Sequence, residues 1–206
     1  MPRQNCVTPF GELIATPARG TLMGNRGCLH DASGRIVRNH RGGYNAWIYC
    51  LLKFKGRRRE VMSPGRYTEL FFLDEATALA AGHRPCAECQ RGRYNEFMRC
   101  WGEGNKALWK GQKLRAPVVD AVLQRERMGE RGEKVKWRAK VGELPVGVMV
   151  EVDDTKAQAF LLEASGLLAW HSGNYKCRTR TSMDRKVAVL TPRSTVKAIA
   201  SGFMPK

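Results

Sequence analysis

The sequence has few acidic residues and few histidines. Its 206 residues include 19 Asp and Glu against 36 Lys and Arg, with four His, so the formal net charge is +17. An excess of this size favours a polyanionic partner through electrostatic attraction and counterion release. A basic amphipathic helix or a lipidation motif, which would direct such charge to a membrane surface, is missing. We therefore expect DNA as the partner, with RNA as an alternative, and no membrane association.

Long hydrophobic runs are also missing. No segment approaches the ~18–20 apolar residues that a transmembrane helix needs. The first twenty residues, MPRQNCVTPFGELIATPARG, lack the continuous apolar region of a secretory signal. We accordingly expect a cytoplasmic protein, in which thiols stay reduced. Seven cysteines, an odd number, stand at positions 6, 28, 50, 86, 89, 100 and 177, and in that setting clustered cysteines indicate a metal site rather than disulfides.

One pair of cysteines has the spacing of half a metal site. The segment GHRPCAECQRGRY, residues 82–94, places Cys86 and Cys89 three positions apart, after a His-Arg-Pro turn and before an expected helix. Tetrahedral zinc takes four nitrogen or sulfur ligands, and a Cys-x-x-Cys turn supplies two of them. A redox dithiol is the alternative for this motif. Zinc is the cofactor that we expect, and its remaining ligands must come from elsewhere in the chain.

The pattern along the chain predicts an α+β fold. The apolar run NAWIYCLLKF (45–54) has strand character, and a basic turn should lead to a second strand that starts at residue 60. A Pro-Gly turn at 64–65 should follow it, and then a third strand over 67–73. Asp74 is a good N-cap for a helix that ends at Gly82, a second helix should begin near Cys89, and a third should cover 118–128. Residues 102–116 and 129–140 are expected to be loop and exposed polar chain. Short strands are expected over 144–152, 159–170 and 187–190.

The segment FFLDEATALAAGHRPCAECQR (71–91) resembles part of the zinc domain of the adaptive-response (Ada-type) DNA methylphosphotriester repair proteins. The match covers about twenty residues and extends more loosely back to 45–54. In that family two further cysteines on an upstream strand complete a four-cysteine zinc site, and the first accepts a methyl group from DNA. The resemblance implies that Cys50 is the third ligand and a methyl-accepting catalytic residue. Phe54 stands where the family has its fourth cysteine.

A different fourth ligand is therefore needed. Cys28 and His30, in GNRGCLHDA, would lie on one face of an extended segment. We predict the metal set Cys86, Cys89, Cys50 and His30, with Cys28 as the substitute for His30. Exchange of a thiolate for a neutral imidazole leaves the site less negative, which favours a structural zinc over a methyl acceptor.

The basic residues around this motif are the predicted nucleic-acid surface. Aromatic residues are interleaved with them, which suits phosphate contacts with occasional base stacking. The predicted contacts are Arg26, Lys53, Lys55, Arg57, Arg58, Arg59, Arg66, Arg84, Arg91 and Arg93.

Two segments summarise the expected organisation. Residues 1–115 should form a small zinc-organised α/β unit that binds nucleic acid, and residues 116–206 a helix with a β-rich extension of unassigned role. We expect a DNA-binding zinc protein in DNA repair or processing. The alternatives are an enzyme acting on DNA, either a methyl acceptor at Cys50 or a nuclease or glycosylase with zinc as scaffold, and a zinc module for RNA or protein interaction. A zinc deaminase is disfavoured, because no His or Cys before Cys86 has the required Glu two residues later.

Overall fold

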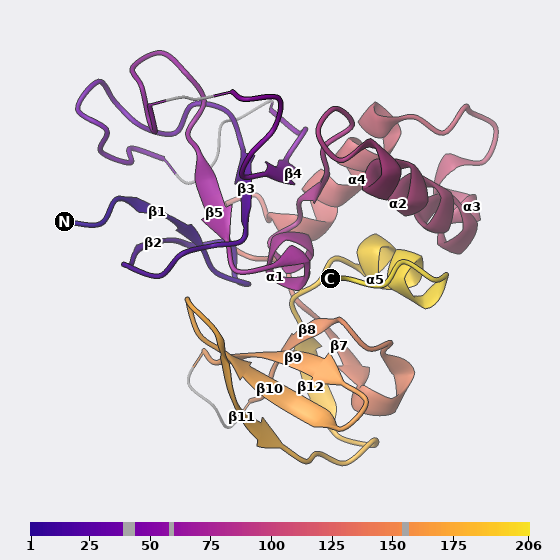
Figure 1. Ribbon diagram of the computed structural model, residues 1–206. Coiled ribbons are helices and arrows are strands. Elements are labelled where there is room, and N and C mark those ends of the chain that lie inside the picture. The colour runs from indigo at the N-terminus through magenta and orange to yellow at the C-terminus, as the bar shows by residue number, and fades with distance from the viewer. Residues whose placement is uncertain (39–43, 58–59, 154–156) are drawn as a thin grey trace.

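The computed structural model describes residues 1–38, 44–57, 60–153 and 157–206. Within these ranges the chain forms two sheets, each of six strands, together with five α-helices (Figure 1). The predicted α+β class is confirmed. One sheet belongs to the N-terminal half of the chain and the other to the C-terminal half, and the helices lie beside and between them.

The N-terminal sheet has the strand order β2-β1-β5-β3-β4-β6. Its pairs are antiparallel except β1 with β5 and β4 with β6, which are parallel. The parallel β4–β6 pair matters for function, because it brings the segment around residue 50 beside the segment that starts the Cys-x-x-Cys motif. The strands are β1 (Gln4–Val7), β2 (Leu13–Ala15), β3 (Leu22–Asn25), β4 (Ile48–Leu51), β5 (Leu70–Phe72) and β6 (Arg84–Pro85).

The short helix α1 (Glu75–Ala80) begins and ends as its sequence predicts. The Asp74 carboxylate accepts a hydrogen bond from the backbone N–H of Thr77 at 2.8 Å, which caps the first turn. After the helix, Gly82 takes a left-handed conformation with φ of +83°. A Cβ at this position would lie 2.5 Å from Cδ of Arg127, so both the backbone angle and the packing require glycine.

Four further helices follow in the chain. They are α2 (Arg91–Gly104), α3 (Lys106–Trp109), α4 (Ala116–Arg127) and, near the C-terminus, α5 (Arg193–Ala200). None of the helices in the described part of the chain is both long and apolar enough to cross a membrane.

The C-terminal sheet has the order β11-β10-β9-β8-β12-β7, and all of its neighbouring strands are antiparallel. A 3₁₀ turn at Val141–Glu143 follows its first strand. The strands are β7 (Trp137–Lys140), β8 (Met149–Glu151), β9 (Ala159–Glu163), β10 (Gly166–Trp170), β11 (Tyr175–Thr179) and β12 (Lys186–Val189).

The larger of two hydrophobic core clusters contains residues from both halves. The same cluster of buried side chains contains Phe72 of the N-terminal sheet, Trp101 of α2 and Val189 of the C-terminal sheet. Helix α4, which the sequence assigned to the C-terminal segment, packs on the N-terminal half, where Arg127 donates hydrogen bonds to the carbonyls of Gly82 and Asn45. The two halves share this core cluster. The division of the chain into two units at residue 115 stays a prediction.

Three details of the predicted secondary structure are wrong. Residues 60–63 form no strand, since Met62 has positive φ and turns the chain, whereas the expected Pro-Gly turn at 64–65 is present. Residues 102–116 contain the end of α2 and all of α3 rather than loop alone. The polar segment 129–140 ends in strand β7, whose exposed lysine and arginine alternate with inward-facing residues.

Candidate metal centre

Strand β4 places Cys50 at the edge of the N-terminal core. The preceding residue, Tyr49, is fully buried, and alternation along the strand turns Cys50 to the opposite face, where it is 9% exposed. Antiparallel pairing sets Cys50 opposite Met23 of β3. The cysteine therefore sits on a strand that has hydrogen-bonded neighbours on both sides, which fixes its backbone.

The Cys-x-x-Cys loop is tied to the same strand by its backbone. The N–H of Cys86 donates to the carbonyl of Tyr49 at 2.9 Å, and the side-chain amide of Gln90 donates to that carbonyl at 3.3 Å. Within the loop, the N–H of Gln90 donates to the carbonyl of Cys86 at 3.2 Å, closing a turn. These bonds hold Cys86 and Cys89 beside Cys50.

A buried ion pair anchors this loop on its other side. Arg84 of β6 donates two hydrogen bonds of 2.7 Å to the two carboxylate oxygens of Asp120 on α4. Both side chains are less than 8% exposed. A bidentate pair of this kind fixes the guanidinium in one orientation, so strand β6 is clamped between β4 and α4 immediately before Cys86.

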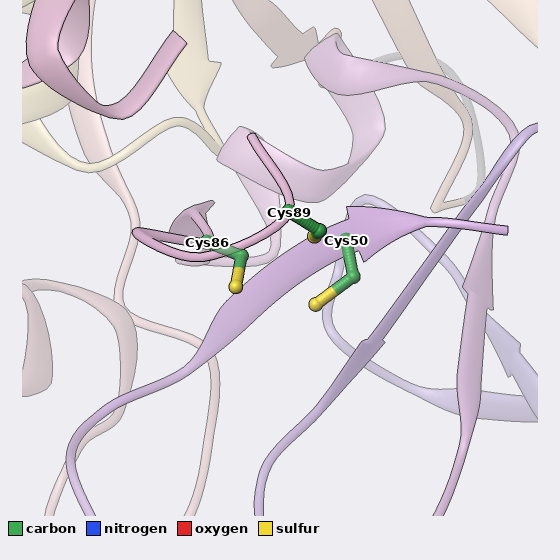
Figure 2. Close-up of side chains that lie close together, drawn as sticks. All are labelled: Cys50, Cys86 and Cys89. Carbon is green, nitrogen blue, oxygen red and sulfur yellow. The ribbon is translucent and has the colours of Figure 1, made fainter. Parts of the chain in front are cut away.

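The three cysteines converge on one point. Their Sγ atoms all lie within 4.8 Å of one another, and Figure 2 shows Cys50 reaching from β4 toward the loop that carries Cys86 and Cys89. Two of the sulfurs accept backbone hydrogen bonds, Cys89 from the N–H of Leu51 and Cys86 from the N–H of Glu88, each at 3.4 Å. Such donors stabilise negative charge on sulfur.

The thiols influence one another's ionisation strongly. A hydrogen bond from Cys50, with backbone donors adding to it, lowers the pKa of Cys86 to about 5. The same hydrogen bond, together with burial and the neighbouring thiols, raises the pKa of Cys50, and burial raises the pKa of Cys89. The cluster thus carries one thiolate readily, while the second and third need a cation to offset their repulsion.

These three residues fit a thiophilic metal ion. Three thiolates suit Zn²⁺, and Zn–S bonds of about 2.3 Å in tetrahedral geometry separate sulfurs by about 3.8 Å. The sulfurs of the cluster, all within 4.8 Å of one another, are compatible with that requirement. Cys50, Cys86 and Cys89 could hold a metal ion, as the sequence predicted for these three.

His30 and Cys28, the predicted candidates for the fourth ligand, lie outside the cluster of three cysteines. In the described residues the group that could hold a metal consists of the three cysteines. His30 instead packs between Thr68 and Ser63: its Nδ1 is 2.6 Å from the Thr68 hydroxyl and its Nε2 is 3.2 Å from the Ser63 carbonyl. Cys28 donates to the backbone carbonyl of His30 at 3.6 Å.

The cysteines open onto a pocket of about 590 Å³. Its walls are largely apolar and aromatic, and include Phe54, the residue at the position of the family's fourth cysteine. Glu69 also lines it. Glu69 is only 3% exposed, and its carboxylate accepts a hydrogen bond from the N–H of Met62 at 2.7 Å. Nothing in the local sequence signals this pocket, because its lining residues come from segments far apart in the sequence, including Met23, Cys50 and Tyr67.

Three of the predicted nucleic-acid contacts bind inside the protein. Arg26 is 1% exposed and donates to Nε2 of His83 and to the carbonyl of Gly11. Arg84 forms the buried pair with Asp120, and Arg93 forms ion pairs with Glu75 and Glu96. Arg26 and Arg84 are therefore not part of an exposed surface, and the side chain of Arg93 is largely enclosed.

The remaining predicted contacts are exposed or lie outside the described residues. Arg57 is exposed, forms an ion pair with Glu88 and lines the pocket beside the cysteines. Lys55 and Arg57 also lie over the ring of Phe54, at 5.3 and 5.5 Å from its centroid. Arg58 and Arg59 lie outside the described residues. The other exposed members are Lys53, Arg66 and Arg91.

Comparison with known proteins adds no relative. Neither a protein-family model, nor a curated protein, nor a solved structure matches this chain. The resemblance to Ada-type zinc domains therefore rests on the motif in residues 71–91 and on the position of Cys50.

Proposed function

We propose that this is a zinc-containing, nucleic-acid-binding protein that acts in the cytoplasm on DNA, in repair or processing. The observation that carries the proposal is the convergence of Cys50, Cys86 and Cys89 from two separate segments. A zinc ion held there would keep the three thiols deprotonated at neutral pH. Cys50 and Cys86 are at most 9% exposed, so metal ligation also accounts for placing ionisable thiols at this edge of the core.

The surface beside the cysteines supports the nucleic-acid part of the proposal. Lys53, Lys55 and Arg57 are exposed on the chain that leaves β4, and the aromatic ring of Phe54 lies among them at the pocket. Cations around an aromatic ring favour phosphate contacts together with base stacking. The net charge of +17 adds long-range attraction to any polyanion.

A second candidate function is methyl acceptance by Cys50, which the resemblance implies. Its support is that Cys50 lines the pocket, so its sulfur borders space in which a substrate could sit. In that reaction the Cys50 sulfur would displace a phosphate oxygen at the methyl carbon, forming an S–CH₃ bond and releasing a phosphodiester. Because Phe54 stands where the family has its fourth cysteine, this chain lacks the fourth thiolate at that position. We therefore favour a structural zinc with a nucleic-acid surface over methyl acceptance.

Metal analysis tests the core of the proposal. Native mass spectrometry of the purified protein should show one zinc ion per chain, and Cys50→Ser or Cys86→Ser should lose it. Cys100→Ser is the matched control, since Cys100 is a fully buried cysteine outside the cluster, and His30→Ala should also keep its zinc. Wild-type protein that takes up no zinc when supplied with it would end the proposal.

Salt-dependent binding tests the nucleic-acid surface. Affinity for duplex and single-stranded DNA should fall steeply with salt, and Lys53→Gln with Lys55→Gln should lower the log–log slope by about 0.9 for each lost duplex phosphate contact. A matched control replaces Lys176 and Lys186, exposed lysines of the C-terminal sheet. Absence of DNA and RNA binding at low salt would point to a protein-interaction module. Mass spectrometry of Cys50 after incubation with methylated DNA separates acceptor from binder.

A further inference from the structure

One face of the N-terminal sheet lines the pocket beside the cysteines. Strands β5, β3 and β4 are neighbours in this sheet, and their side chains alternate between the buried core and the pocket. The antiparallel register aligns Phe71, Met23 and Cys50 in one row across the three strands. One position further along β3 and β5, the same register brings Asn25 beside Glu69. All five of these residues line the pocket.

Glu69 is a buried acidic residue whose carboxylate has no cationic partner among the described residues. One carboxylate oxygen, Oε2, accepts from the N–H of Met62. The other, Oε1, has neither a hydrogen bond nor an ion pair within the part of the chain that the structure describes. Arg57 lines the same pocket, but its guanidinium is ion-paired with Glu88. A carboxylate withdrawn from water in this way is stabilised by further N–H donors, which a ligand could supply.

Asn25 presents the complementary group next to this carboxylate. It is 8% exposed, and its Oδ1 accepts from the N–H of Gly27 at 3.4 Å and from the hydroxyl of Tyr44 at 3.3 Å. The backbone donor fixes which end of the amide is oxygen, so Nδ2 is the free end, without an acceptor in the described residues. Neither this Nδ2 nor Oε1 of Glu69 is among the polar atoms sealed from solvent without a partner. An available donor and an available acceptor therefore stand on neighbouring strands at the pocket.

We propose that this pocket holds one unpaired base of a single-stranded nucleic acid, an inference that rests on the proposed nucleic-acid function. Every nucleobase carries an N–H donor beside an acceptor on its Watson–Crick edge, which is exposed only when the base is unpaired. Glu69 would accept from the N–H, and Asn25 would donate to the neighbouring acceptor. The rings of Phe71 and Phe54 line the same space and offer surfaces for stacking. A volume of about 590 Å³ lies in the range of small-ligand sites.

The charges favour a base in the pocket over a phosphate. The carboxylate of Glu69 is buried within it, whereas Lys53 and Lys55 are exposed on the chain that leaves β4. A phosphate is repelled by the first and attracted by the other two. The backbone of a bound strand therefore stays on the exposed basic segment, and an uncharged base enters.

Fluorescence anisotropy with two single strands of equal length and charge tests this pocket. One strand contains all four bases, and the other is abasic. Wild-type protein should bind the first about fivefold more tightly or better, and Glu69→Gln should lose most of that preference while it binds the abasic strand like wild type. Glutamine keeps an oxygen for Met62 but replaces the free acceptor with a donor.

General electrostatics predict the opposite result for Glu69→Gln. Loss of one negative charge by itself tightens binding to a polyanion. Glu130→Gln, at an exposed residue of the loop after α4, makes the same change of charge and is the matched control, which should keep the preference for the strand with bases.

The outcomes separate the pocket from the wider function. If wild type binds both strands equally, or Glu69→Gln keeps the full preference, the base pocket is wrong and the nucleic-acid function stands. Equal weakening of both strands by Glu69→Gln would assign the residue a structural role and likewise overturn the pocket. Absence of binding to either strand at low salt would overturn both proposals.

Photochemical cross-linking gives a second measurement that needs no variant. Each base of the strand is replaced in turn by a photoreactive analogue, and the linked residues are identified by mass spectrometry. At least one analogue should attach to Phe71, which is half-buried at the pocket, and the analogue that does so identifies the preferred base. Cross-links confined to residues outside the pocket for every analogue would contradict the proposal.

Discussion

Replacement of Asp120 by alanine should destabilise the protein by about 3–5 kcal/mol, the range for removing one partner of a buried ion pair. The magnitude follows from the geometry at Arg84. Both charged groups are nearly inaccessible to water, and both carboxylate oxygens accept 2.7 Å hydrogen bonds from the guanidinium. Alanine would leave the guanidinium buried without its carboxylate, and Tyr94, 5.7 Å away, replaces little of the lost interaction.

Urea denaturation, followed by far-UV circular dichroism, measures this difference. The metal content of both proteins must be matched, because an ion that binds the folded state alone also stabilises it. For a protein of this size each 1 kcal/mol lowers the melting temperature by about 2–4 °C, so a drop of about 6–20 °C should accompany the change.

A double variant that removes both charges gives the control. Arg84→Met combined with Asp120→Leu removes both charges and keeps apolar volume, and should recover most of the stability that Asp120→Ala loses. A loss below 1 kcal/mol in Asp120→Ala, or a double mutant as unstable as the single one, would refute the view that this pair clamps β6.

Three further predictions concern the backbone and two titrating sites. Gly82→Ala should lower the free energy of unfolding by more than about 1 kcal/mol in urea denaturation, since alanine disfavours the left-handed conformation and its Cβ would meet Arg127; an unchanged midpoint would contradict the packing described. Because the pKa of Lys134 falls to about 7 in the folded state while the unfolded chain keeps an ordinary value, the unfolded state binds more protons above pH 7. Stability should therefore rise with pH between about 7 and 10, by at most about 1.4 kcal/mol per pH unit from this group, and Lys134→Met should remove that rise; identical pH profiles would count against the assignment. Finally, zinc uptake at pH 7 should release about two protons, measured by calorimetry in buffers of different ionisation enthalpy, because Cys86 alone has a pKa lowered below that pH; release of none would exclude ligation by Cys50 and Cys89.

The parts of the fold that the sequence predicts are those governed by local chemistry. The Asp74 cap and the glycine at position 82 define α1 because capping and left-handed backbone depend on a few adjacent residues. Alternating short apolar segments likewise predict several strands of the C-terminal sheet. Strand β7 could not be predicted in this way, because its outward side chains are charged. It is a strand because it pairs with β12, about fifty residues further along the chain.

In the candidate site, too, the features set by adjacent residues could be predicted and those set by distant residues could not. The Cys-x-x-Cys spacing by itself indicates two ligands. Cys50 is indicated by its position on an apolar strand together with the resemblance to Ada-type zinc domains. The position of His30 could not be predicted in this way, because proximity in an extended segment does not fix the direction of a side chain in space, and this imidazole contacts Thr68 and Ser63. The burial of Arg26 was equally invisible, since it depends on Trp47 and on residues of α4 and its following loop.

The last residues described close a network that begins in the first sheet. The Glu75 carboxylate accepts from the Tyr49 hydroxyl, from Arg93 and from the backbone N–H of Lys206, and the carbonyl of Met204 accepts from Arg93. During synthesis on the ribosome, residues 49–93 emerge long before residues 203–206. The hydrogen bonds to Met204 and Lys206 can therefore form only after the C-terminal segment has been translated.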